Sequence, residues 1–157
     1  MRRKEKSFPE REVIDKIIYD AQICHLACSL EDQPYVIPIS FGYDGQTVFF
    51  HTASSGKKND IFFKNPRVCL CFETRVHLVT DQKNACGWTF DFQSVIATGE
   101  IREITDPDRK YTGMNQIMRH YSGKDWEMPE NEIEKTKIWG VKLETLTGKR
   151  SPAAGRY

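Results

Sequence analysis

A β-prone run with a proline inside it, residues 35–41, limits most strongly what this chain can fold into. Aromatic and β-branched residues favour a strand, but Pro38 has no N–H to donate to a neighbouring strand. The run therefore predicts an edge strand, a bulge, or a strand whose backbone is left open for something else. The Asp44-Gly45 pair that follows is typical of a hairpin turn, and Thr47–His51 is expected to be the returning strand.

The rest of the chain alternates between strand-like and helix-like segments without a regular order. Further strands are expected at 22–30, 67–74, 90–104 (with a bulge at Gly99) and 138–146. Helices are expected at 9–21, 57–65 and 106–121, one helical turn at 132–137, and a long hairpin connection at 75–87. This arrangement favours an antiparallel barrel with helices packed outside it over a doubly wound parallel sheet.

The length indicates one ordinary domain, residues 1–157. Lys and Arg number 23 against 22 Asp and Glu, so the net charge of +1 predicts neither a nucleic-acid nor a membrane partner. No apolar run approaches the roughly 18 residues that a membrane span needs, and no signal peptide is recognised. Both ends, 1–8 and 148–157, are expected to be flexible tails.

Five cysteines, an odd number, do not predict a disulfide framework. Their spacing contains no C-x2-C pair, so no metal site is predicted and the cysteines are expected to act as small buried hydrophobes. Because no signal peptide and no membrane span are recognised either, this favours a reducing cytoplasm. The cysteines are Cys24, Cys28, Cys69, Cys71 and Cys86.

The segment Phe49–Asn59, FFHTASSGKKN, offers the most chemistry. Small residues let backbone N–H groups approach an anion, and the start of a helix at Lys57 and Lys58 adds positive charge. The segment predicts either a phosphate cradle or a solvated loop before a lysine-rich surface helix. His51 beside it is either a hydrogen-bonded structural residue or a group that transfers protons near neutral pH.

An aromatic stripe follows further along the chain. Trp88, Phe90 and Phe92 alternate, so a strand would place them on one face. Such a stripe is expected in the core, or else as an aromatic wall around a planar ligand or as a dimer interface.

A series of short motifs runs in a fixed order through residues 2 to 150. They are Arg2-Arg3, Pro34–Ile39, Phe50–Ala53, Gly56–Lys58, Asn65–Cys69, Ser94–Ile96 with Gly99, and Thr147–Arg150. The series resembles the nitroimidazole-resistance (Nim) branch of the pyridoxamine-phosphate-oxidase-like family of flavin-binding split barrels. The resemblance implies a mostly β fold, a six-stranded antiparallel split β-barrel with flanking helices, which forms a homodimer with FMN between its subunits.

The resemblance also assigns a site. The flavin phosphate would be held by the lysines and serines of 54–58, the isoalloxazine would lie along 36–40, and Ser94 with Val95 would match a segment that often reaches the cofactor from the partner subunit. His51 matches the histidine associated with the Nim active site and is the expected catalytic residue. The expected cofactor contacts are Val36, Ile37, Pro38, Ile39, Ser40, His51, Thr52, Ala53, Ser54, Ser55, Gly56, Lys57, Lys58, Ser94 and Val95.

The activity implied by the resemblance is that of a flavin-dependent oxidoreductase that passes electrons to a small planar acceptor, such as a nitro-aromatic compound. True pyridoxamine-phosphate oxidases carry a C-terminal substrate motif with Arg and His, which is not found in 148–157, so vitamin B6 oxidation is disfavoured. FAD, haem and the deazaflavin F420 are the alternative cofactors. A non-catalytic flavin- or haem-binding storage or sensor module is the alternative function.

Overall fold

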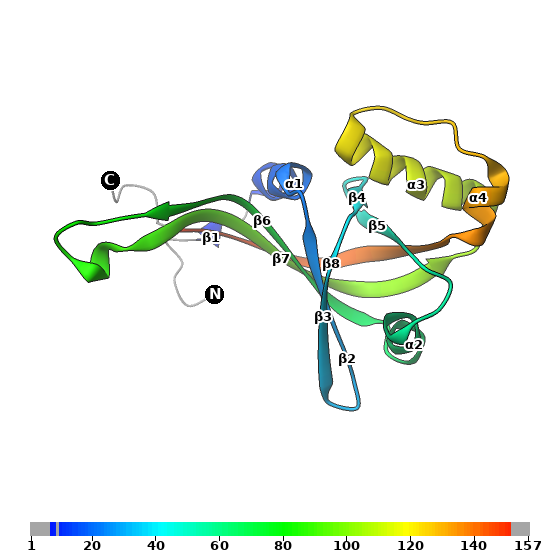
Figure 1. Ribbon diagram of the computed structural model, residues 1–157, viewed down its shortest axis with the longest axis horizontal. Coiled ribbons are helices and arrows are strands. Elements are labelled where there is room, and N and C mark those ends of the chain that lie inside the picture. The colour runs from blue at the N-terminus through cyan, green and yellow to red at the C-terminus, as the bar shows by residue number, and fades with distance from the viewer. Residues whose placement is uncertain (1–6, 9, 152–157) are drawn as a thin grey trace.

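The computed structural model describes residues 7–8 and 10–151. In this part of the chain the strands form one antiparallel eight-stranded sheet, in the order β3-β2-β6-β7-β8-β5-β4 with β1 beside β8 (Figure 1). The elements are β1 (Ser7–Phe8), α1 (Arg11–Asp20), β2 (Cys24–Leu30), β3 (Gln33–Ile39), β4 (Gly42–Tyr43), β5 (Thr47–Thr52), α2 (Lys57–Lys64), β6 (Arg67–Val79), the 3-10 helix η2 (Ala85–Gly87), β7 (Thr89–Ile104), α3 (Pro107–Ser122), α4 (Glu130–Lys135) and β8 (Lys137–Ser151).

The mostly β, antiparallel fold that the sequence predicts is confirmed, but its strand count differs. Six long strands match the six predicted ones, and the two-residue strands β1 and β4 add two more. The predicted bulge is present, because the pairing of β7 with β8 shifts between Thr98 and Gly99. A Cβ atom at Gly99 would lie 2.1 Å from the Lys142 carbonyl oxygen, so this close approach of the two strands requires glycine.

The predicted tails and the predicted long connection need correction. Residues 148–151 continue β8 and pair with 92–95 of β7, and Ser7–Phe8 pairs with Gly148 and Lys149. Polar residues such as these join a strand because the neighbouring strands satisfy their backbone groups. Likewise, β6 continues to Val79, which shortens the connection expected at 75–87. The remainder of the predicted tails, 1–6 and 152–157, lies outside the described residues.

Two clusters of apolar side chains make up the core. The larger one joins α1 and α2 to one face of the sheet, called here the inner face, which carries Leu26, Leu70, Phe72 and Val95. The smaller cluster lies where α3 packs on β5 and β8, through Phe49, Ile104, Ile117 and Ile138. The opposite face of β2, β3, β6 and β7 is called the outer face. None of the helices in the described part of the chain is long and apolar enough to cross a membrane.

A hairpin arm, residues 75–90, extends beyond the barrel at the ends of β6 and β7 (Figure 1). Four large apolar side chains on it are about half exposed, namely Val76, Leu78, Trp88 and Phe90. The expectation that the aromatic stripe lies in the core is therefore wrong for Trp88 and Phe90. Their part of the hairpin runs past the helices that cover the barrel, so nothing in the described chain buries them.

The cysteines follow their prediction only in part. All five are free thiols, with Cys24 and Cys28 buried, Cys69 and Cys71 half-buried, and Cys86 exposed. Cys86 departs from the expected buried position because it lies in η2, at the tip of the hairpin arm.

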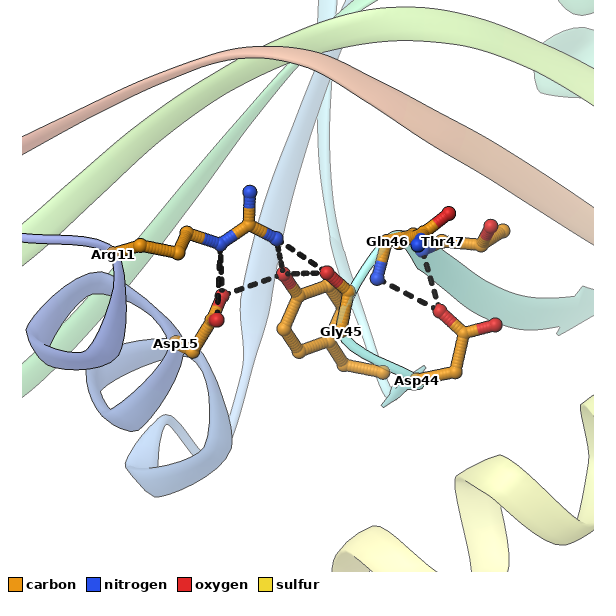
Figure 2. Close-up of polar contacts among 7 residues, drawn as sticks. Arg11, Asp15, Asp44, Gly45, Gln46 and Thr47 are labelled. Atoms are coloured by element: carbon orange, nitrogen blue, oxygen red, sulfur yellow. Dashed lines mark hydrogen bonds and ion pairs between the residues drawn. The ribbon is translucent and has the colours of Figure 1, made fainter.

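A polar network holds α1 against the β4–β5 turn (Figure 2). The Tyr43 hydroxyl donates to Asp15 Oδ1 at 2.7 Å and accepts from Arg11 Nη2 at 2.8 Å, and Arg11 also donates to the Gly45 carbonyl. Burial, and then the hydrogen bond to Asp15, raise the pKa of Tyr43. The predicted Asp-Gly turn is confirmed, because the Asp44 carboxylate accepts from the N–H groups of the two residues after Gly45, at 2.9 and 2.7 Å.

Candidate functional site

A buried polar network fixes the loop that follows β5. Trp139 Nε1 donates to Thr52 Oγ1 at 3.0 Å, and Asn59 Nδ2 donates to the Ala53 carbonyl at 2.9 Å. The Thr52 hydroxyl in turn lies 2.9 Å from the Ala53 carbonyl oxygen and 3.1 Å from Asn59 Oδ1. Thr52, expected to contact the cofactor, is buried, and its hydroxyl contacts groups of this loop.

Asn59 and Trp139 are functional candidates that sequence reasoning missed. Both act through the loop rather than on a ligand, and each is buried. The one sequence signal for Asn59 is its position, because it is a polar residue in the first turn of α2, three residues after Gly56. Trp139 could not be found in this way, because its β8 strand lies far from the loop in sequence and pairs with β5 only in the folded chain.

The start of α2 presents an uncapped helix end to the loop. Gly56 has φ +137°, a conformation that favours glycine, and its carbonyl accepts from the N–H of Asn59 at 2.9 Å to begin the helix. No side chain caps this end, and residues 54–57 are exposed. The positive end of the helix dipole and the Lys57 ammonium therefore lie together at an accessible surface, as an anion site requires.

Lys57 links this helix end to β3. Its Nζ lies 4.9 Å from the centroid of the Tyr35 ring, a cation–π contact between α2 and the edge strand. On the neighbouring strand β2, the Cys28 thiol donates to the Tyr35 carbonyl at 3.6 Å. Burial raises the pKa of Cys28, and the charge of Lys57 partly opposes this effect. The predicted phosphate cradle and the proline-containing strand are thus neighbours in space.

The edge position predicted for the proline-containing strand is confirmed. Among the described residues β3 pairs with β2 alone, so its other edge is free. Val36 and Pro38 are exposed on the outer face, while Ile37 and Ile39 pack partly against the core. Ser40 follows the strand and is exposed. A planar ligand at this edge would meet unpaired backbone groups and apolar side chains.

His51 lies on the face of β5 opposite to Thr52. Side chains alternate along β5, so His51 shares a face with Phe49 and projects away from the face of Thr52 and Phe50. Its side chain is exposed and has no hydrogen-bond partner within residues 7–8 and 10–151. The hydrogen-bonded structural interpretation of His51 therefore finds no support, and its catalytic role stays a prediction.

Ser94 and Val95 are not brought to the same place as β3. Val95 is fully buried in the larger core cluster, and Ser94 is buried on the outer face of β7. Two strands, β2 and β6, separate β7 from β3. At the usual spacing of neighbouring strands this is a distance of about 14 Å. Within one chain, Ser94 and β3 are therefore not neighbours.

The comparisons with known proteins give the family. A family model described as pyridoxamine 5'-phosphate oxidase matches residues 10–150. The chain belongs to this family. The family resemblance that the sequence motifs indicate is thereby confirmed over nearly the whole length of the chain.

Solved structures share the fold. A candidate 5-nitroimidazole antibiotic resistance protein from Bacteroides thetaiotaomicron is 28% identical, with a TM-score of 0.81 over 92% of this chain and 86% of that one. A FAD and heme binding protein from Mycobacterium smegmatis is 15% identical, with a TM-score of 0.82 over 94% of this chain and 74% of that one.

A sequence relative is also found. An uncharacterized protein from Rhizobium meliloti is 27% identical over 94 residues, which are 60% of this chain and 54% of that relative.

Proposed function

We propose that this protein binds FMN and works as a flavin-dependent oxidoreductase that passes electrons to a small planar acceptor, such as a nitro-aromatic compound. The observation that carries the proposal is the contact of Lys57 with Tyr35, which joins a cationic helix end to the free edge of β3. The cationic helix end suits a phosphate, and the free edge of β3 suits a planar ring. Family membership and the likeness to the candidate 5-nitroimidazole resistance protein add support.

Bound FMN would supply the redox chemistry. For their part, Lys57 and the N–H groups at the start of α2 would hold its phosphate, with Ser54 and Ser55 as additional donors. Backbone groups at the free edge of β3 would orient the ring. An imidazole nitrogen of His51 would supply a proton to the reduced acceptor.

We further propose that the flavin lies between two copies of the chain. Two strands separate Ser94 from β3 within one chain, whereas a second copy on the outer face would bring its own β7 next to β3. That face and the adjoining hairpin arm expose large apolar side chains, as an interface between copies would require. They include Val36, 60% exposed, Ile96, 41% exposed, and Trp88 and Phe90.

The cytoplasm is the proposed location. All five cysteines are free, including the exposed Cys86, and free thiols persist in a reducing compartment.

The first experiment adds FMN to the purified protein, removes the excess by gel filtration and records the absorption spectrum. Retained oxidised flavin that elutes with a dimer is the expected result. Lys57→Gln should weaken FMN binding by roughly tenfold, the loss of one charged hydrogen bond. Lys64→Gln, at the other end of α2, is the matched control and should bind normally. A protein that retains no flavin would contradict the proposal, and titrations with FAD, haem and F420 would follow.

Electron transfer separates the enzyme from a storage or sensor module. The bound flavin should bleach with a reduced nicotinamide or dithionite and reoxidise when a nitro-aromatic compound is added. Flavin that is retained but shows no acceptor-dependent reoxidation would favour the module. His51→Ala should lower turnover while the flavin stays bound, and unchanged turnover would remove His51 from the mechanism.

A further inference from the structure

Three polar side chains form a row across the inner face, where the barrel gives way to the hairpin arm. Thr74 of β6 is directly opposite Gln93 of β7, and Gln93 is directly opposite Arg150 of β8. Side chains directly opposite each other lie on one face with Cβ atoms about 5 Å apart. Phe72 and Val95, one pair closer to the barrel, are fully buried, so the row borders the core.

Two atoms of this row are buried without a hydrogen-bond partner. They are the Thr74 hydroxyl oxygen and Arg150 Nε, and no group in the described part of the chain reaches either of them. Thr74 itself is only 8% exposed. Buried polar groups in folded proteins are nearly always paired, because an unpaired one loses its hydrogen bonds to water without replacement. An unpaired hydroxyl and an unpaired guanidinium nitrogen on the same row therefore indicate a ligand.

We propose that Thr74, Gln93 and Arg150 form a binding site for an oxyanion, either a free carboxylate or a phosphate group. A guanidinium matches the geometry of such oxygens and stays charged at all ordinary pH values. The hydroxyl and the amide add two neutral donors. This site is separate from the Lys57 cradle, because it lies on β6, β7 and β8 rather than on β3 and α2.

The nearest acids define the charge of the site. Glu73 adjoins Thr74 in sequence, but its side chain lies on the outer face. Asp91 lies on the inner face two residues from Gln93 and makes no ion pair with Arg150 among the described residues. Asp91 repels an anion, so its removal should strengthen binding. The site also gives a role to the Thr147–Arg150 motif, which the flavin site does not use.

The test is calorimetric titration of the flavin-loaded protein with inorganic phosphate and with acetate, at ionic strength held constant with chloride. Saturable binding of one anion per chain is expected. Arg150→Gln and Thr74→Val should each weaken it by roughly tenfold or more, and Asp91→Asn should strengthen it. Arg102→Gln, which removes the same charge from an exposed position on β7, is the matched control and should bind normally.

Each variant is checked for folding by its thermal transition. Thr74→Val keeps the shape of the side chain and removes the unpaired hydroxyl, so it should fold with an equal or higher Tm. Equal anion binding in the wild type and in Thr74→Val and Arg150→Gln would overturn the site. Release of the flavin by phosphate would also overturn it, since the anion would then occupy the cofactor's place. Failure of the protein to take up flavin would leave the anion titration interpretable, because that titration can be repeated on the flavin-free protein.

Discussion

At the scale of single residues, position in the folded chain decides what a side chain can do, and the sequence reveals position only in part. Lys57 was identified because small residues and a helix start surround it in the sequence. The resemblance predicts a cofactor contact for Thr52, and in the structure its hydroxyl contacts Asn59 and Ala53. The partner that decides its role, Trp139, is 87 residues away along the chain. Such long-range contacts leave no local pattern.

His120 should make stability depend on pH. Its ring contacts Phe41 and Tyr121, and its Nε2 lies 2.7 Å from the Ala21 carbonyl oxygen. Burial lowers its pKa below the ordinary value of 6.5, and the hydrogen bond to Ala21 opposes this only partly. The unfolded chain therefore binds a proton more readily than the folded one, so the free energy of unfolding should fall as the pH drops through about 6.5.

Denaturant unfolding at pH 7.5 and 5.5 measures this effect. His120→Gln keeps a donor for Ala21 and removes the titration, so its loss of stability between the two pH values should be smaller than that of the wild type. His77→Gln, at an exposed position on the hairpin arm, should behave like the wild type. An equal loss in His120→Gln and the wild type would show that other groups cause the whole effect.

The cysteines should differ sharply in their reaction with a thiol reagent at pH 7.5. Burial, and then the charge of Glu73, raise the pKa of Cys71 to about 11, so little of its thiol is in the reactive thiolate form. Cys86 is exposed. Mass spectrometry of briefly labelled protein should find the label on Cys86 first. Cys86→Ser should abolish the fast phase and Cys71→Ser should leave it unchanged, and the reverse pattern would contradict this assignment.

At the scale of elements, helices and strands with a clear period or a turn signal were predictable. The Asp-Gly turn and the N-terminus of α3 are examples, and Asp106 caps that helix by accepting from the Arg109 N–H at 2.9 Å. The predictions failed where pairing overrides local composition. Residues 148–151 are polar and look like a tail, but β7 and β1 supply partners for their backbone groups.

Tyr43→Phe should test how firmly α1 is held to the β4–β5 turn. The substitution keeps the buried ring but removes a hydroxyl that bonds both Asp15 and Arg11 (Figure 2). We expect a loss of about 1–3 kcal/mol in the free energy of unfolding, measured by chemical denaturation. Tyr19→Phe, at a half-exposed ring that packs against Tyr43, is the control and should change stability by less than about 0.5 kcal/mol. Equal effects of the two substitutions would contradict a specific role for the network.

At the scale of the whole molecule, α1 and α2 cover the inner face of the sheet and α3 packs on the other face at β5 and β8. The outer face of β2, β3, β6 and β7 is the part that carries exposed apolar groups. The proposed dimer uses this outer face. The fold class followed from the sequence because turn signals and strand periods recur along the whole chain. The halves of the proposed site could not be located relative to each other in this way, because β3 and β7 become neighbours only if a second copy is present.

Ile96→Glu should therefore weaken the dimer. Ile96 is 41% exposed on the outer face, and a carboxylate there would be buried in an interface between copies. Sedimentation analysis should show a shift towards monomer together with weaker FMN retention. Val13→Glu replaces a side chain of similar exposure on α1, at 39%, and should leave the association unchanged. A wild-type protein that is monomeric with FMN bound would exclude the arrangement.

The free edge of β3 has a further consequence, for solubility. An unpaired strand edge can accept a strand from another molecule and so start aggregation. Pro34 and Pro38 stand opposite Ser29 and His25 in this strand, and neither proline offers an N–H to an incoming chain. The two rings interrupt the ladder that a fibril would need, while carbonyl groups remain for a ligand. Replacing both prolines with valine should thus make the free edge of β3 prone to irreversible self-association.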